Sequence, residues 1–248
     1  MSAAQELLRQ YLAQRLAVEP GAVVLPAGQA VRPSARSRRD MPPIPEDGIT
    51  VETPQTTDLF ARDPLAELDL EGLEAMVRSC TKCPLHKSRT NAVFGEGPPD
   101  ADLIVVGEGP GQTEDQTGRP FVGRAGQLLD EILAAIERPR PTVYIANIVK
   151  SRPPGNRKPT PDEVQACAPY LYRQIALIRP KVILAMGATA AETLLGTRGA
   201  LTTFRNKVHR FRGVPLIVTY HPAALLRNPH WKRPTWDDVR IARQLLER

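Results

Sequence analysis

A glycine-rich loop that carries three acidic side chains is the first candidate for chemistry in this chain. The stretch LIVVGEGPGQTED, residues 103–115, contains Glu108, Glu114 and Asp115 directly after an apolar run. Glycine loops after strands usually bind phosphates through exposed backbone N–H groups, and carboxylates would repel that anion. The loop also lacks the third glycine of a dinucleotide fingerprint and the Gly-Lys-Ser/Thr ending of a P-loop. The sequence therefore predicts another chemistry for this loop.

Phe121 is the first aromatic residue after these carboxylates and precedes the next expected helix. Carboxylates beside a stacking surface suit a reaction that builds positive charge on a sugar next to a base. Cleavage of a glycosidic bond does this through an oxocarbenium-like transition state, which carboxylates stabilise while they position water. The structural alternative is a capped turn whose acidic side chains lie on the surface.

Two further polar side chains, Asn147 and His221, lie at the ends of other apolar runs. Asn147 offers one acceptor and one donor, which match the N3–H donor and the O4 acceptor of uracil, a pattern that cytosine reverses. His221, in YHPAALLRNP, is placed to donate a hydrogen bond to a leaving group. The alternatives are an asparagine bonded to loop backbone and a histidine with a structural role.

The segment after His221 combines apolar and basic residues, as Leu225 and Leu226 precede Arg227 and Asn228. Apolar side chains at a loop tip can fill the gap that an extruded base leaves, while cations hold the phosphates. We therefore expect Leu225, Arg227 and Asn228 to contact DNA. The alternative is a helix start that buries its leucines.

The alternation of apolar runs with helical patterns predicts a three-layer α/β/α fold around a central, mainly parallel, four-stranded sheet. The strands are expected over residues 102–107, 142–149, 181–187 and 214–220, and the helices over 70–80, 125–136, 188–196 and 235–248, with another beginning at Thr160. Ligands bind beyond the carboxyl ends of parallel strands. Those ends are Gly107-Glu108, Asn147, Gly187 and His221, which predicts one crevice.

The composition favours a basic protein that meets a polyanion, since the net charge is +6 and the isoelectric point is near 9.5. No apolar run approaches the ~20 residues of a membrane span, and no secretory signal is recognisable, which favours a cytoplasmic location. Residues 63–248 are expected to form the catalytic domain. Residues 1–62 are expected to hold an amphipathic helix over 4–17, which could dock a repair or replication protein, and then a disordered Pro/Arg-rich linker.

Three stretches carry a family resemblance: GEGPGQTEDQTGRPFVGRAGQLL, YIANIVKSRPPGNRKPTPDE and YHPAALLRNP. Together they resemble the signature stretches of the family 4, iron–sulfur, uracil-DNA glycosylases, over roughly residues 70–246. The resemblance implies that Glu108 aids attack on the sugar and that His221 stabilises the uracil anion as it leaves. Substrate binding then falls to Gly109, Glu114, Asp115, Phe121 and Asn147. Among these, the resemblance puts Glu114 near the base and Phe121 on its face, and Asn147 would read its edge.

The family resemblance also implies a [4Fe–4S] cluster held by four cysteines, and this chain has three, Cys80, Cys83 and Cys167. Ser151 occupies the remaining position, in VKSRPPGN. A serine oxygen is a harder donor than a thiolate and a poorer ligand for such clusters. Three outcomes are open: a cluster with Ser151 or solvent on one iron, a three-iron form, or no cluster. Because the cluster would be structural, its loss should lower stability before activity.

These observations predict a monofunctional DNA glycosylase, monomeric, that flips deoxyuridine from single- or double-stranded DNA and leaves an abasic site. Two alternatives stay open. One is a glycosylase for another deaminated base, such as hypoxanthine. The other is a non-catalytic DNA-binding protein that serves as a damage sensor or replication accessory, although such a protein would have no need of Glu108, Asn147 and His221 together.

Overall fold

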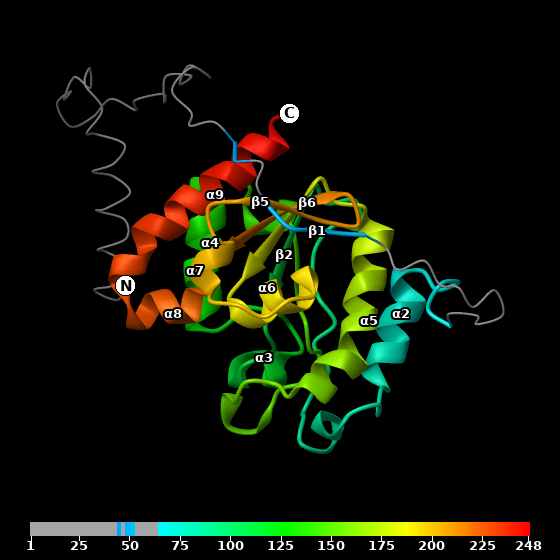
Figure 1. The fold of residues 1–248 in the computed structure, drawn as a ribbon. Coiled ribbons are helices and arrows are strands. Elements are labelled where there is room, and N and C mark those ends of the chain that lie inside the picture. The colour runs from blue at the N-terminus through cyan, green and yellow to red at the C-terminus, as the bar shows by residue number, and fades with distance from the viewer. Residues whose placement is uncertain (1–43, 46–47, 53–63) are drawn as a thin grey trace, which may run out of the picture. The chain divides into compact units, whose positions relative to one another are not determined.

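The computed structural model describes residues 44–45, 48–52 and 64–248, shown as coloured ribbon in Figure 1. The chain divides into two units, Met1–Ile44 and Pro45–Arg248, and the architecture given below is that of the second. The helix predicted over residues 4–17 and most of the predicted linker lie outside the described residues. Within the described residues, no helix has both the length and the apolar character needed to cross a bilayer.

A six-stranded sheet in the order β1-β5-β6-β4-β2-β3 forms the centre of the fold. The strands are β1 Thr50–Val51, β2 Leu103–Gly107, β3 Tyr144–Asn147, β4 Val182–Met186, β5 Val208–Phe211 and β6 Val214–Thr219. The four predicted strands are β2, β3, β4 and β6, and they pair in parallel as expected. The predicted strand number was too low, because β5 and β1 extend the sheet on one edge.

The two additional strands have weak sequence signals. β5 pairs antiparallel with β6 through a tight turn in which Arg212 and Gly213 have φ values of +49° and +81°. Such turns are usually signalled by Asn-Gly or Asp-Gly, and arginine gives no such signal. β1 has only two residues and falls in the segment that we predicted to be a disordered linker, so the linker prediction is wrong at Thr50–Val51.

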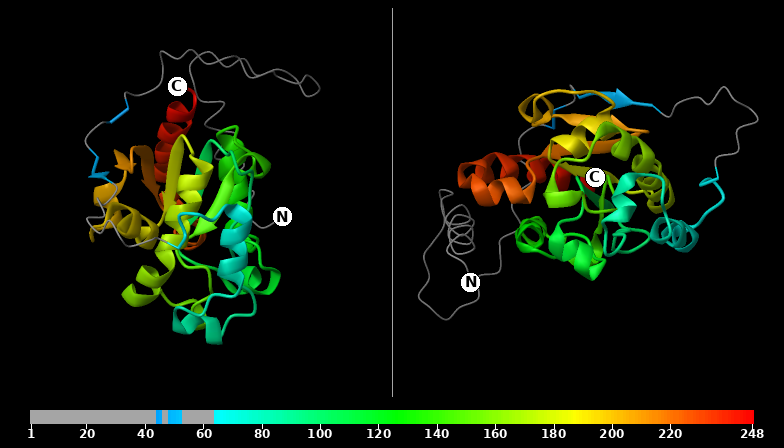
Figure 2. Two further views of the ribbon diagram at one scale, coloured as in Figure 1. Left: turned by 90° about the vertical axis from the view of Figure 1, so that its right-hand side faces the viewer. Right: turned by 90° about the horizontal axis from the view of Figure 1, so that it is seen from below.

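Helices cover both faces of the sheet, which confirms the three-layer fold (Figure 2). The helices are α2 Leu70–Arg78, α3 Gln112–Thr117, α4 Arg124–Ala135, α5 Pro161–Ile178, α6 Ala188–Leu195, α7 Leu201–Phe204, α8 Pro222–Arg227 and α9 Lys232–Leu246. Short 3-10 turns span Pro84–Lys87, Arg140–Thr142, Pro154–Asn156 and Pro229–Trp231. Helices α2, α5 and α6 share one apolar core with the sheet, while α9 packs on β4 and β6.

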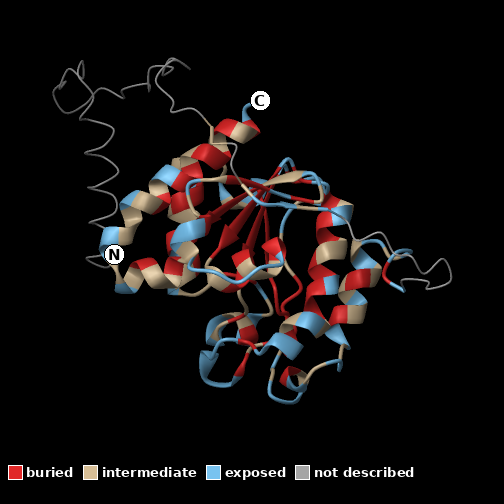
Figure 3. Ribbon diagram, viewed as in Figure 1, coloured by how far each residue is buried: buried red, intermediate tan, exposed pale blue. Residues whose placement is uncertain are grey.

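Every residue of β2, β3 and β4 is buried, as Figure 3 shows for the strands at the centre of the molecule. Continuous burial is what a parallel sheet covered on two faces requires, and it explains why these strands read as unbroken apolar runs. Helix α5 begins at the predicted position, since Thr160 and Glu163 form a reciprocal capping box with Pro161 in the first turn.

Candidate active site

The carboxyl ends of four strands converge at one edge of the sheet, as the sequence predicts. Gly107 and Asn147 are partners in the β2–β3 ladder, so Glu108 and Asn147 leave the sheet from neighbouring strands. At the end of β4, the Gly187 N–H donates to the carbonyl of Thr219 in β6 (2.9 Å). A Cβ at position 187 would lie 3.2 Å from the Cβ of His221, which places His221 beside the end of β4.

Phe121 and Asn147 meet over the end of β2. A Cβ at Gly107 would overlap both the ring of Phe121 and the amide oxygen of Asn147, so glycine at this position permits the two side chains to approach. The ring of Phe121 stacks on the imidazole of His221, with 5.4 Å between centroids and 29° between planes. An aromatic face, an amide edge and an imidazole therefore lie close together at the strand ends.

The amide oxygen of Asn147 is buried and accepts no hydrogen bond from any of the described residues. A buried acceptor without a donor costs about 1–3 kcal/mol, so native structures seldom keep one without a reason. A ligand with an N–H group at this position would remove that cost. Asn147 thus has the property expected of a base-reading side chain, rather than of an asparagine bonded to its own loop.

His221 is oriented by helix α8, whose N-cap it forms. Its Nδ1 accepts from the backbone N–H of Ala223 (3.2 Å), so the neutral ring carries its proton on Nε2, which is then a donor. Burial, together with the charge of Arg227, lowers the pKa of His221 to about 4, against the opposing influence of Glu114. The histidine is therefore a neutral hydrogen-bond donor at ordinary pH.

Glu108 is held by Thr189, a residue that the sequence analysis did not identify. The Thr189 hydroxyl, in the first turn of α6, donates to Oε2 of Glu108 (2.5 Å). The other carboxylate oxygen accepts no hydrogen bond from the part of the chain that the structure describes. Thr189 lies two residues beyond Gly187, so extending the strand-end rule into the following helix would have found it.

Glu114 fixes two loops through backbone N–H groups. Its Oε1 accepts from Val122 (2.9 Å) and Gly123 (2.8 Å), and its Oε2 accepts from Gly111 (3.1 Å). Its charge also opposes the lowering of the His221 pKa. A position of Glu114 beside a bound base stays a prediction.

Asp115 and Gly109 have contacts that account for them structurally. The buried Asp115 carboxylate accepts from the N–H of Thr90 (2.9 Å). A Cβ on Gly109 would overlap the side chain of Val149, so the glycine lets two loops pack closely. Neither observation supports the substrate-binding role predicted for these two residues.

The expectation of an exposed apolar wedge at Leu225 is wrong. His221 caps α8 and Pro222 occupies its first position, so the segment is helical, and the inward-facing Leu225 is 1% exposed. The alternative of a helix that buries its leucines therefore holds for Leu225. Arg227 is exposed and Asn228 is half-buried, and a DNA contact by either of them stays a prediction.

A profile of the uracil DNA glycosylase superfamily matches residues 94–242, which include all of these strand ends. The chain belongs to this superfamily, and to its type-4 family. It is 45% identical over 194 residues to a type-4 uracil-DNA glycosylase of Thermotoga maritima, covering 77% of this chain and 99% of that one. A second type-4 enzyme, of Pyrobaculum aerophilum, is 46% identical and covers 65% of this chain and 87% of its own. The type-5 uracil-DNA glycosylase of Thermus thermophilus is 32% identical, covering 62% and 74% respectively.

The three cysteines of this type-4 family member lie near one another. Burial, with smaller contributions from the nearby Cys83 and Cys80, raises the pKa of Cys167 to about 11, while Lys150 opposes the increase. The Tyr170 hydroxyl donates to Sγ of Cys80 (3.3 Å), and the Lys150 N–H donates to Sγ of Cys167 (3.2 Å). Hydrogen bonds of this kind commonly surround thiolates that ligate iron.

Ser151 lies in the same neighbourhood as these thiols. Arg89 donates to its hydroxyl (3.0 Å) and also lowers the pKa of Cys83, which burial raises. Among the described residues, no three His, Cys, Asp or Glu side chains are arranged as a metal-binding group. The three cysteines therefore match a cluster by residue type, while their arrangement among the described residues is not that of a metal-binding group.

The titration of His221 tests the electrostatics of this site. We expect its ring to stay neutral, with the proton on Nε2, from pH 8 down to about pH 4. Protonation is unfavourable for two reasons: the new Nδ1–H donor would face the N–H donor of Ala223, and burial disfavours the charged ring. The folded protein should also lose stability as the pH falls from ~6.5 to about 4, because only the unfolded chain takes up this proton there. The measurement is an NMR pH titration of the ring nitrogens, in which the His221 signals are assigned by their loss in His221→Gln. A titration midpoint of His221 near the ordinary histidine pKa would contradict the prediction.

Proposed function

We propose that this chain excises uracil from DNA by hydrolysing the N-glycosidic bond of a flipped deoxyuridine, which leaves an abasic site. The observation that carries the proposal is the unpaired, buried amide oxygen of Asn147, which lies against the ring of Phe121 in a member of the type-4 family. Such an acceptor suits the N3–H of uracil, and the amide N–H of the same side chain suits O4. Cytosine presents the opposite pattern and would leave both groups unpaired.

Departure of the base is assisted by His221. When the C1′–N1 bond breaks, its electron pair stays on uracil, and negative charge develops on the ring. The neutral Nε2–H of His221 can donate to the O2 side of that anion, and one preorganised donor of this kind contributes about 2.7–4 kcal/mol. A neutral His221 ring can fill this role, because it donates a hydrogen bond to the uracil anion and does not have to transfer its proton.

Attack on the sugar is assisted by Glu108. The sugar becomes an oxocarbenium-like cation, which the Glu108 carboxylate stabilises by its charge. Water adds to C1′ and gives up a proton, and the free oxygen of Glu108 can accept it. Thr189 holds the other oxygen, so the carboxylate has a single orientation for both tasks.

We propose that the enzyme has no lyase step. Lys150, three residues beyond Asn147, is buried, and its Nζ donates to the side chain of Gln174 (2.6 Å). Such a step requires an amine that reaches C1′ of the sugar. The sequence-based prediction of a monofunctional enzyme is retained on this ground.

Uracil-containing DNA, single- or double-stranded, is the proposed partner. The net charge of +6 and the exposed Arg227 support contact with phosphates. Flipping is easiest from single strands and mismatches, so U opposite G should be cleaved faster than U opposite A. Cytoplasmic location and a monomeric state belong to this proposal. Docking of a repair or replication protein on the predicted helix over residues 4–17 concerns residues outside those described.

We propose also that Cys80, Cys83 and Cys167 hold an iron–sulfur cluster, with Ser151 at the remaining position. Membership of the type-4 family and the presence of these three cysteines support this. The role of the cluster would be structural, because the proposed reaction assigns departure of the base to His221 and attack of water on the sugar to Glu108. With three thiolates, a labile cluster is expected.

The cleavage assay tests the proposed function. End-labelled oligonucleotides with one deoxyuridine, as U·G, U·A and single strand, are treated under single-turnover conditions, and alkali reveals abasic sites. Glu108→Gln should lower the rate by roughly 10² or more, because it removes both the charge and the proton acceptor. Thr189→Val should lower it by a smaller factor. Thr193→Val is the matched control on α6, since within the described part of the chain the Thr193 hydroxyl bonds only to the carbonyl of Thr189 (2.7 Å).

Binding of these substrates by the wild type without any alkali-labile site would contradict the proposed function and favour a damage sensor. Faster release of hypoxanthine than of uracil from matched strands would favour the other glycosylase. A Glu108→Gln variant as fast as the wild type would remove the role given to that carboxylate.

Substitution Ser151→Cys tests the cluster. A fourth thiolate should raise the iron content towards about four per chain, strengthen the visible absorbance and raise the melting temperature. Ser151→Ala is the matched variant, because it removes the hydroxyl without adding a thiol. Unchanged iron, absorbance and melting temperature in Ser151→Cys would show that this position plays no part in holding iron.

A further inference from the structure

Phe121 has a backbone conformation that residues other than glycine rarely adopt. Its φ is +49°, in the left-handed region, and the residue is 5% exposed. A strained conformation of this kind persists only when the surroundings determine it, and it occurs most often at functional sites. The contacts that fix the two peptide units around Phe121 therefore also fix the position of its ring.

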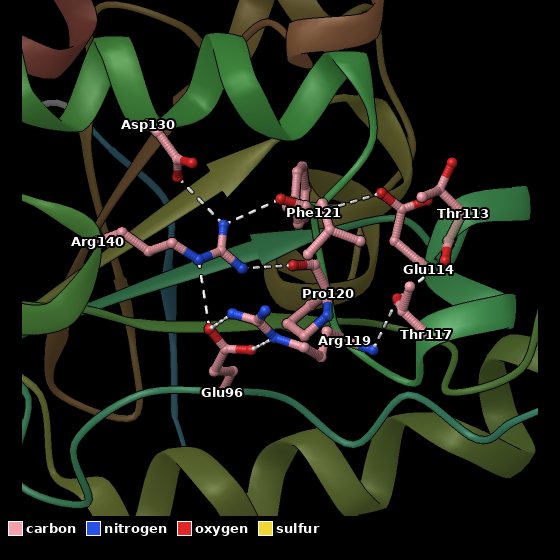
Figure 4. Close-up of polar contacts among 10 residues, drawn as sticks. Glu96, Thr113, Glu114, Thr117, Arg119, Pro120, Phe121, Asp130 and Arg140 are labelled. Atoms are coloured by element: carbon pink, nitrogen blue, oxygen red, sulfur yellow. Dashed lines mark hydrogen bonds and ion pairs between the residues drawn. The ribbon is translucent and has the colours of Figure 1, made fainter.

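Arg140 contacts both of these peptide units. Its Nη2 donates to the carbonyl of Pro120 (2.6 Å), and its Nη1 donates to the carbonyl of Phe121 (2.9 Å). These two carbonyls belong to the peptide units that precede and follow the Cα of Phe121, so together they set its φ and ψ. Figure 4 shows the guanidinium group with these two carbonyls on one side and carboxylates on the others.

The peptide unit after Phe121 is bound at both ends by opposite charges. Its carbonyl accepts from the guanidinium of Arg140, and its N–H, that of Val122, donates to the carboxylate of Glu114 (2.9 Å). Gly126, in the first turn of α4, makes room for the Phe121 carbonyl, which a Cβ would overlap. Hydrogen bonds to charged groups are stronger than those between neutral groups, so this peptide plane has little freedom to rotate.

Arg140 is itself fixed by acidic partners. Its Nη1 also donates to Asp130 (3.1 Å) and its Nε to Glu96 (3.3 Å). Arg119 binds the same Glu96 through two hydrogen bonds (2.7 and 2.9 Å), which, with the charge of Arg140, hold the pKa of Glu96 below its ordinary value. The guanidinium side chain is only 17% exposed, so these contacts are less screened than those at the surface.

The same cluster is attached to the strand that carries Asn147. Glu96 forms a β-bridge with Ile145 in β3, through hydrogen bonds of 2.9 and 2.7 Å between their backbones. Arg140 begins the 3-10 turn that leads into β3. The stacking face at Phe121 and the reading edge at Asn147 thus share one rigid support.

We propose that Arg140 is a positioning residue of the reaction: it holds the peptide units on both sides of Phe121, so that the ring lies parallel to a uracil bound at Asn147. The proposal rests on the proposed function. Arg140 touches neither base nor sugar, and it acts through the backbone alone. Its effect should therefore fall on recognition of the base and on the rate, rather than on the binding of DNA.

The test compares Arg140→Met with wild type and with Arg119→Met, which removes the outer partner of Glu96 but leaves both carbonyl contacts. Three quantities are measured: the single-turnover rate on a single-stranded uracil substrate, the inhibition constant of free uracil, and the affinity for DNA with a tetrahydrofuran abasic analogue. Arg140→Met should slow cleavage by about 10- to 100-fold and weaken uracil inhibition, while the abasic-DNA affinity stays within about twofold. Arg119→Met should stay within about twofold in all three.

A folded Arg140→Met that cleaves and binds uracil within about twofold of wild type overturns the proposal, and so does an equal loss in Arg119→Met. If Arg140→Met does not fold, Arg140→Lys carries the test, because one ammonium group cannot replace the planar fork on two carbonyls. A rate for Arg140→Lys equal to wild type would then overturn it. Failure of the wild type itself to cleave uracil contradicts the proposed function instead, and is seen before any variant is compared.

Discussion

The ladder between β2 and β3 is the constraint on which the rest of the site depends. Its last pair is Gly107 and Asn147, so the acidic loop and the amide of Asn147 leave the sheet side by side. Because Gly107 lacks a Cβ, Phe121 and Asn147 can both lie against the end of β2. An aromatic face and an amide edge are thereby placed side by side, as the proposed binding of a planar base requires, and His221, which follows β6, stacks on Phe121.

The acidic residues of the glycine loop now have a physical explanation. In a phosphate-binding loop the backbone N–H groups are left for the ligand. Here Glu114 takes those of Gly111, Val122 and Gly123, and Asp115 takes that of Thr90. The anions are internal, so the loop is rigid without a phosphate. Glu108 instead bonds a side chain, that of Thr189, and its other carboxylate oxygen accepts no hydrogen bond from the described residues, which suits the proposed reaction through a cation.

Much of this arrangement follows from the sequence, because buried parallel strands read as apolar runs and their ends are marked by polar residues. The convergence of Glu108, Asn147 and His221 could be predicted for that reason. Thr189 and Arg140 were missed because their partners are distant in sequence: 81 residues separate Thr189 from Glu108. Leu225 was misjudged because apolar residues beside basic ones fit an exposed tip as well as a short helix, and only the cap at His221 decides between them.

The most direct test of the account is the base specificity of the wild-type enzyme, measured as single-turnover rates on three single strands that differ only in one base. These carry uracil, cytosine or hypoxanthine at the same position, so flipping from a duplex does not enter. The account predicts rapid release of uracil and, because both groups of Asn147 would be left unpaired, release of cytosine slower by about 10⁴-fold or more. Comparable rates for uracil and cytosine would contradict the central claim that the buried amide of Asn147 reads the base.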